Sequence, residues 1–164
     1  MTDLAIWHDV FIASSAAAAT LAGLILAAMA VNIDSILKYP QLPSRAGSAI
    51  GSLIYVLVLT VAALVPNETV VGLGILTLVL LLGTLAIHVD VLVRQFQIRP
   101  PQTFGRVWTK FALALGQIVP FVVSGILMVQ GSTAVGLDWL IIGAAAVFIC
   151  SVVNAWVLLV EIRR

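Results

Sequence analysis

Charged residues divide this chain into five long uncharged windows, and this spacing limits its possible folds more than any other feature. The windows are 21 to 27 residues long and cover 10–33, 46–67, 69–89, 111–137 and 139–160. A helix rises about 1.5 Å per residue, so each window is long enough to cross a hydrocarbon layer about 30 Å thick. The sequence therefore predicts an all-α membrane protein, folded as a bundle of five transmembrane helices.

Composition excludes a soluble protein. Hydrophobic residues make up 62% of the chain and charged residues 9%, whereas about 25% of a soluble globular domain is charged. Allowing for turns, we expect a single integral-membrane domain, 1–164, with spans at 10–33, 46–66, 69–90, 111–130 and 139–160. We expect the first span to be retained and not cleaved as a signal peptide, because Asp3 and Asp9 precede it and no Lys or Arg does.

The basic residues predict an orientation. Lys and Arg in short loops remain on the cytoplasmic side of a membrane. All eight fall in alternate connections or at the C-terminus: Lys38, Arg45, Arg94, Arg99, Arg106, Lys110, Arg163 and Arg164. We therefore expect the N-terminus outside and the C-terminus in the cytoplasm, in a bacterial cytoplasmic (inner) membrane. Between spans three and four, four basic residues are expected to bind anionic lipid headgroups: Arg94, Arg99, Arg106 and Lys110.

Small residues recur at every fourth position of the first two spans. They are Ser15, Ala19, Gly23 and Ala27, followed by Gly47 and Gly51. Helices in lipid associate where small residues let their backbones approach closely. Two interpretations stay open: packing inside the bundle, and contact with a second copy of the chain in a homo-oligomer. In the fourth span, Pro120 lacks an N–H group and predicts a kink that leaves the Gly116 carbonyl available to another donor.

Uncharged polar side chains gather toward the expected cytoplasmic ends of all five spans. Polar groups are costly in hydrocarbon and usually face the bundle interior or a wet cavity. The candidates for a polar site or pathway are Asn32, Ser52, Thr84, His88, Gln117 and Asn154. Thr84 and His88 are four residues apart and so share a helix face. The alternative is that each residue only makes a hydrogen bond between helices or a contact near the membrane surface.

The sequence lacks the motifs of enzymes and of metal or cofactor sites. His8 and His88 are expected near opposite membrane faces, Cys150 is the single cysteine, and no His-Glu-x-x-His or glycine-rich phosphate loop occurs. We therefore expect no catalysis, no cofactor, no metal and no nucleic-acid partner. Two functions stay open: an accessory, regulatory or assembly partner of other inner-membrane components, and a homo-oligomeric channel for an ion or small polar solute.

The first 45 residues carry a recognisable pattern. It comprises His8-Asp9, an alanine-rich start to the first span, Leu21-Ala22-Gly23-Leu24-Ile25, Ala30-Val31-Asn32-Ile33 and Leu42-Pro43. In these residues the chain resembles a family of small bacterial integral-membrane proteins, some of which are named as modulators of an FtsH-type membrane protease. The resemblance implies a multi-span inner-membrane protein and draws attention to Gly23 and Asn32, but it implies no mechanism.

Overall fold

Five long helices and one short helix make up the part of the chain that the structure describes. The computed structural model describes residues 3–33, 41–66, 68–98 and 104–160. In this part of the chain the elements are α1 (Asp3–Ile6), α2 (His8–Val31), α4 (Gln41–Ala63), α5 (Val70–Ile98), α6 (Phe104–Val129) and α7 (Thr133–Val160). The prediction of an all-α fold is confirmed, and each predicted span overlaps one of the five long helices.

Three helical segments are long and apolar enough to cross a membrane. They are His8–Val31, Ala46–Ala63 and Thr133–Trp156, and shorter apolar stretches occupy Val70–Ala86 in α5 and Leu115–Val129 in α6. Large apolar side chains point outward on these helices: Leu24 is 57% exposed and Ile149 is 66% exposed. Contact between such apolar surfaces and lipid acyl chains has no free-energy cost, whereas their exposure to water is unfavourable. Length and composition therefore indicate a membrane protein.

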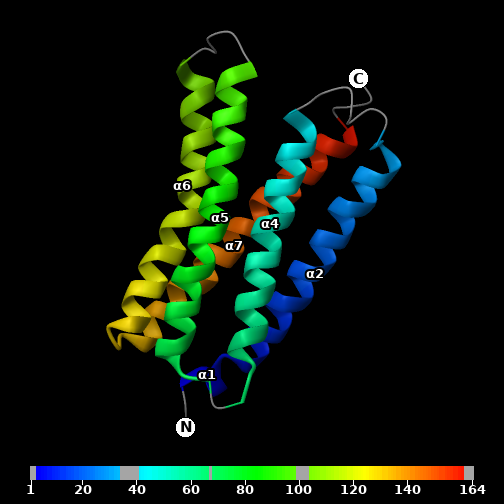
Figure 1. Cartoon of the computed structure of the whole chain (residues 1–164). Coiled ribbons are helices and arrows are strands. Elements are labelled where there is room, and N and C mark those ends of the chain that lie inside the picture. The colour runs from blue at the N-terminus through cyan, green and yellow to red at the C-terminus, as the bar shows by residue number, and fades with distance from the viewer. Residues whose placement is uncertain (1–2, 34–40, 67, 99–103, 161–164) are drawn as a thin grey trace.

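Helices α4 and α7 form the centre of the bundle. α4 packs against α2, α5 and α7, and α7 packs against α2, α4 and α6. α5 and α6 form a pair on one side of this centre, and α2 lies on the other side (Figure 1). The N-terminal helix α1 and the α6–α7 turn lie at one end of the bundle, and α2, α5 and α7 end toward the other (Figure 1).

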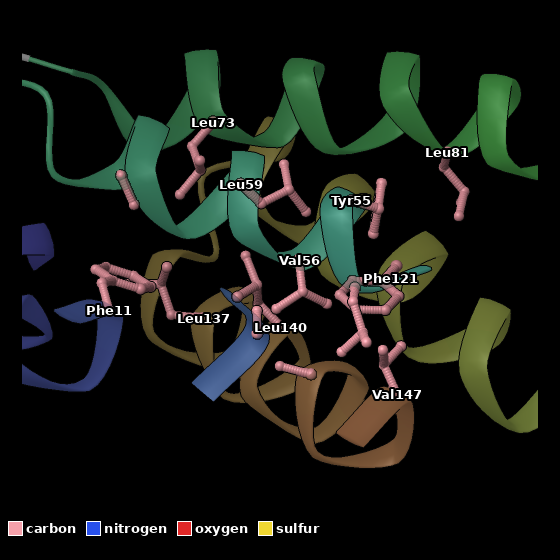
Figure 2. Close-up of a cluster of buried hydrophobic side chains, with 14 of the residues drawn as sticks. Phe11, Tyr55, Val56, Leu59, Leu73, Leu81, Phe121, Leu137, Leu140 and Val147 are labelled. Atoms are coloured by element: carbon pink, nitrogen blue, oxygen red, sulfur yellow. The ribbon is translucent and has the colours of Figure 1, made fainter. Parts of the chain in front are cut away.

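Large side chains fill the middle of the bundle. Phe11, Leu137 and Leu140 lie toward the end that holds α1, and Tyr55 and Phe121 lie farther along the bundle (Figure 2). All five are buried, with at most 5% of their surface exposed. The rings of Tyr55 and Phe121 meet edge to face, with centroids 4.8 Å apart and planes at 85°, an arrangement that aromatic pairs prefer.

Glycines allow α5, α6 and α7 to approach one another closely. A Cβ at Gly74 would lie 3.1 Å from the carbonyl oxygen of Gly125, and a Cβ at Gly125 would lie 3.3 Å from the carbonyl oxygen of Gly74. A Cβ at Gly136 would lie 3.3 Å from the Ser124 carbonyl oxygen, and one at Gly143 would lie 2.9 Å from the Phe121 ring. None of these four glycines belongs to the series of small residues that was predicted to pack.

Within the described part of the chain, the small residues that were singled out do not bring helices close together in this way. Gly23 is exposed, as are Ala19 and Ala27. A Cβ at Gly23, Gly47 or Gly51 would meet no described atom within 4 Å. The interpretation of Gly23 as a packing residue inside the bundle is therefore wrong, because α2 buries the opposite face. At Gly47 and Gly51 no described neighbour supports that interpretation either.

The connection between α6 and α7 is a tight turn that depends on one glycine. Gly131 has φ 86°, in the left-handed region that glycine enters without a steric penalty. Its N–H donates to the Met128 carbonyl oxygen, and the N–H of Ser132 donates to that of Leu127 at 2.9 Å. This pair of bonds is the Schellman arrangement that ends helices. Farther back, α6 stays helical on both sides of Pro120, which is buried.

Candidate functional site

Three of the six predicted polar residues line one pocket. Ser52 comes from α4, Thr84 from α5 and Gln117 from α6, and α7 closes the fourth side. The full lining is Ser52, Tyr55, Leu81, Thr84, Gln117, Ile118, Phe121 and Val147. The structure thus brings together residues that are 65 positions apart in the chain, from Ser52 to Gln117.

Helical spacing explains why these side chains share a pocket. Ser52 lies three residues before Tyr55 on α4, and Gln117 lies four residues before Phe121 on α6. Residues three or four apart lie on the same helix face. The face that carries the aromatic ring therefore also carries the polar group, one turn nearer the end of the bundle where α4 and α6 begin.

The floor of the pocket is the Tyr55–Phe121 pair. The phenol hydroxyl of Tyr55 donates a hydrogen bond of 3.1 Å to the Thr77 carbonyl oxygen on α5, and Thr77 Oγ1 donates to the Leu73 carbonyl oxygen at 2.8 Å. The first bond links α4 to α5 and fixes the ring of Tyr55 against Phe121. Below this floor, Leu59 and Leu73 are fully packed, so the pocket ends at the aromatic pair.

The polar groups at the rim differ in their hydrogen bonding. Ser52 Oγ donates to the Ser48 carbonyl oxygen at 3.1 Å, and Thr84 Oγ1 donates to the Leu81 carbonyl oxygen at 3.0 Å. Gln117 is half-buried, and its carboxamide makes no hydrogen bond with the described part of the chain. The described lining residues carry no charge. The pocket therefore offers an amide that can both donate and accept.

Two of the other predicted polar residues, Asn32 and Asn154, are not among the described residues that line this pocket. Asn32, just after α2, is half-buried, and its Nδ2 donates to the Ala28 carbonyl oxygen of its own helix at 3.1 Å. Asn154 is half-buried on α7 and has a partner of its own. The side chains of His88, Arg94, Arg106 and Lys110, together with Arg99, lie outside the described residues.

A second feature is the surface of α2 that carries Ser15, Ala19, Gly23 and Ala27, here called the α2 stripe. α2 packs onto α4 and α7 through Phe11, Ala18, Ile25 and Ala28. The first three of these are seven residues apart and lie on the face opposite Gly23. Ser15 Oγ donates to the Ile12 carbonyl oxygen at 2.8 Å, so its hydroxyl is satisfied within α2. The α2 stripe is a smooth surface of small residues that faces away from the bundle.

The aromatic floor was not predicted, because the candidates for the polar site were chosen among uncharged polar side chains of the five spans. The available signal was Tyr55 itself, a hydroxyl-bearing ring in the middle of an uncharged window and three residues after Ser52. A buried tyrosine hydroxyl needs a partner, which places it toward another helix.

Metal-binding groups of three or more His, Cys, Asp or Glu do not occur among the described residues. Comparisons with protein-family models, with curated proteins and with solved structures found no match. The family resemblance of the first 45 residues therefore stays a prediction. The proposed function depends on the geometry of the chain.

Proposed function

We propose that the chain is a non-enzymatic membrane protein that acts as an accessory, regulatory or assembly partner of other inner-membrane components. On this proposal all five long helices span a bacterial inner membrane, with the N-terminus outside and the C-terminus in the cytoplasm. Arg94 near the end of α5, Arg106 and Lys110 near the start of α6, and Arg99 between the two helices then lie beside the inner leaflet, where they bind anionic headgroups.

The observation that supports this proposal is the exposed α2 stripe. α2 is a 24-residue helix that buries only four of its residues in the bundle, and only 17% of its most apolar window is buried. Small residues at four-residue spacing permit close helix contact in lipid, yet no described atom lies within 4 Å of a Cβ at Gly23. The partner that we propose for this surface is a transmembrane helix, from a second copy of the chain or from another membrane protein.

The alternative is a homo-oligomeric channel for an ion or small polar solute. The pocket at Ser52, Thr84 and Gln117 favours this function, because it places polar groups from three helices together. A path through one chain would have to pass the Tyr55–Phe121 pair and the packed leucines beneath it. A channel would therefore run between subunits.

The size of the native assembly tests the proposed function. The chain is extracted with its surrounding lipid into polymer nanodiscs, and the mass and composition of the particles are measured for three variants. We expect the wild type to carry additional copies or another membrane polypeptide, and Gly23→Leu to lose it. Gly83→Leu is the matched control, because Gly83 is exposed on α5 with no described atom within 4 Å of a Cβ. A wild type that is always a single chain, or a Gly23→Leu variant that keeps its partners, would contradict the proposal.

A further inference from the structure

The pocket beneath Gln117 has room for one small molecule. The space open to the centre of a water-sized molecule is about 20 Å³, and a bound water needs about 10–15 Å³ measured in this way. The described lining is uncharged, so nothing in it offsets the large cost of removing an ion from water. The small volume and the uncharged described lining together favour a small neutral molecule as the occupant.

The chemistry of the rim restricts the occupant further. The Gln117 carboxamide has two N–H donors and one carbonyl acceptor, and it makes no hydrogen bond with the described part of the chain. A buried or half-buried amide in hydrocarbon is costly unless it is hydrogen-bonded. The occupant must therefore both accept and donate hydrogen bonds, and water is the molecule of this size that does so.

We propose that this pocket is a hydration site, in which water binds the Gln117 carboxamide and the Tyr55–Phe121 pair ends the wet part of the bundle. This inference does not depend on the docking role of α2. It divides the bundle into a wet half, toward the end where α4 and α6 begin, and a dry half beyond the aromatic pair.

The residues beyond the aromatic pair agree with a dry half. Thr60 and Thr77 are fully buried, and each hydroxyl donates to a carbonyl oxygen four residues earlier in its own helix, at 2.9 Å and 2.8 Å. These polar groups are satisfied by the backbone and need no solvent. On the pocket side the hydroxyls of Ser52 and Thr84 also donate to backbone carbonyl oxygens, so Gln117 is the described polar group of the lining that needs water.

Water-edited solid-state NMR of the wild-type protein in lipid bilayers tests this inference, with water itself as the probe. We expect magnetisation from water to reach the Gln117 side-chain amide about as fast as it reaches Ser132 in the exposed α6–α7 turn. Transfer to Thr60 and Thr77 should be several-fold slower. If the Gln117 amide instead shows contacts with lipid acyl chains and slow transfer from water, the inference is overturned.

A substitution tests whether the aromatic pair ends the wet region. Phe121→Leu should let water advance and should speed the transfer from water to Thr77 several-fold. Phe148→Leu is the matched control, because Phe148 is a half-buried phenylalanine on α7 that does not line the pocket. Transfer to Thr77 that is already fast in the wild type would overturn the inference, whether or not the variant folds.

Discussion

Gly74→Ala should weaken the contact between α5 and α6. A Cβ at residue 74 would lie 2.9 Å from Met128 Cβ and 3.1 Å from the Gly125 carbonyl oxygen. Because nonbonded carbon atoms are best placed about 3.5–4.0 Å apart, the new methyl would be too close to Met128 Cβ by about 0.6–1.1 Å. Both opposing atoms are held directly by the α6 backbone. Rotation of a side chain cannot relieve the clash, so the two helices must separate.

Two opposing effects determine how much Gly74→Ala changes the free energy of unfolding. Overpacking of this kind costs about 1–3 kcal/mol, whereas replacing glycine by alanine inside a helix gains about 0.5–1 kcal/mol. Gly83 lies on the same helix, is exposed, and has no described atom within 4 Å of a Cβ, so Gly83→Ala should show only the gain. The difference in unfolding free energy between the two variants therefore isolates the steric cost, about 1–3 kcal/mol.

The assay is reversible unfolding in mixed lipid–detergent micelles, followed by intrinsic tryptophan fluorescence. We expect Gly83→Ala to be as stable as the wild type or slightly more stable, and Gly74→Ala to be clearly less stable than Gly83→Ala. If the two variants were equally stable, α5 and α6 could not be in contact at Gly74, and the helix arrangement would be refuted at this point.

Two further substitutions test single interactions in the same unfolding assay. Ser124→Ala removes the 2.7 Å hydrogen bond from Ser124 Oγ to the Gly136 carbonyl oxygen, so we expect a loss of about 0.6 kcal/mol, and at most about 1.7 kcal/mol. Ser15→Ala removes only a hydrogen bond within its own helix and should lower the unfolding free energy less. Equal losses in the two variants would contradict the hydrogen bond from Ser124 on α6 to Gly136 on α7. Gly131→Ala forces a side chain into φ 86° and should cost about 1–2 kcal/mol. Gly83→Ala is its control, and no loss at Gly131 would refute the left-handed turn.

The helices could be predicted from the sequence, but their ends could not. Apolar length and missing charge locate a segment that suits hydrocarbon, so each uncharged window overlaps a helix. A helix satisfies its own backbone hydrogen bonds and need not stop where charge begins. α5 therefore continues to Ile98, past Asp90 and Arg94, and α7 begins at Thr133, before Asp138.

The packing faces could not be predicted because they depend on how each helix is rotated against its neighbours. The α2 stripe is the more regular series of small residues, yet α2 turns Phe11 and Ile25 inward. Gly74 and Gly125 belong to no such series, and they meet because α5 and α6 cross there. Local spacing identifies surfaces that allow close approach, whereas the whole bundle decides which of them are used.

The pocket was partly predictable because depth can be counted along a helix. Ser52, Thr84 and Gln117 lie at similar distances from the ends of their windows, on three helices that pack together. Asn32 was placed in the same group by depth alone. It lies instead at the end of α2, and its amide bonds its own helix. Depth gives the layer in which a residue lies, but not its direction around the bundle.

The most direct test of the docking proposal is photocrosslinking at Gly23 in native membranes. A photoreactive amino acid replaces Gly23 in one variant and Gly83 in the other, and the products are analysed by mass. The proposal predicts a discrete crosslink from residue 23 to another transmembrane polypeptide, and only lipid adducts from residue 83. Lipid adducts alone at both positions would contradict it.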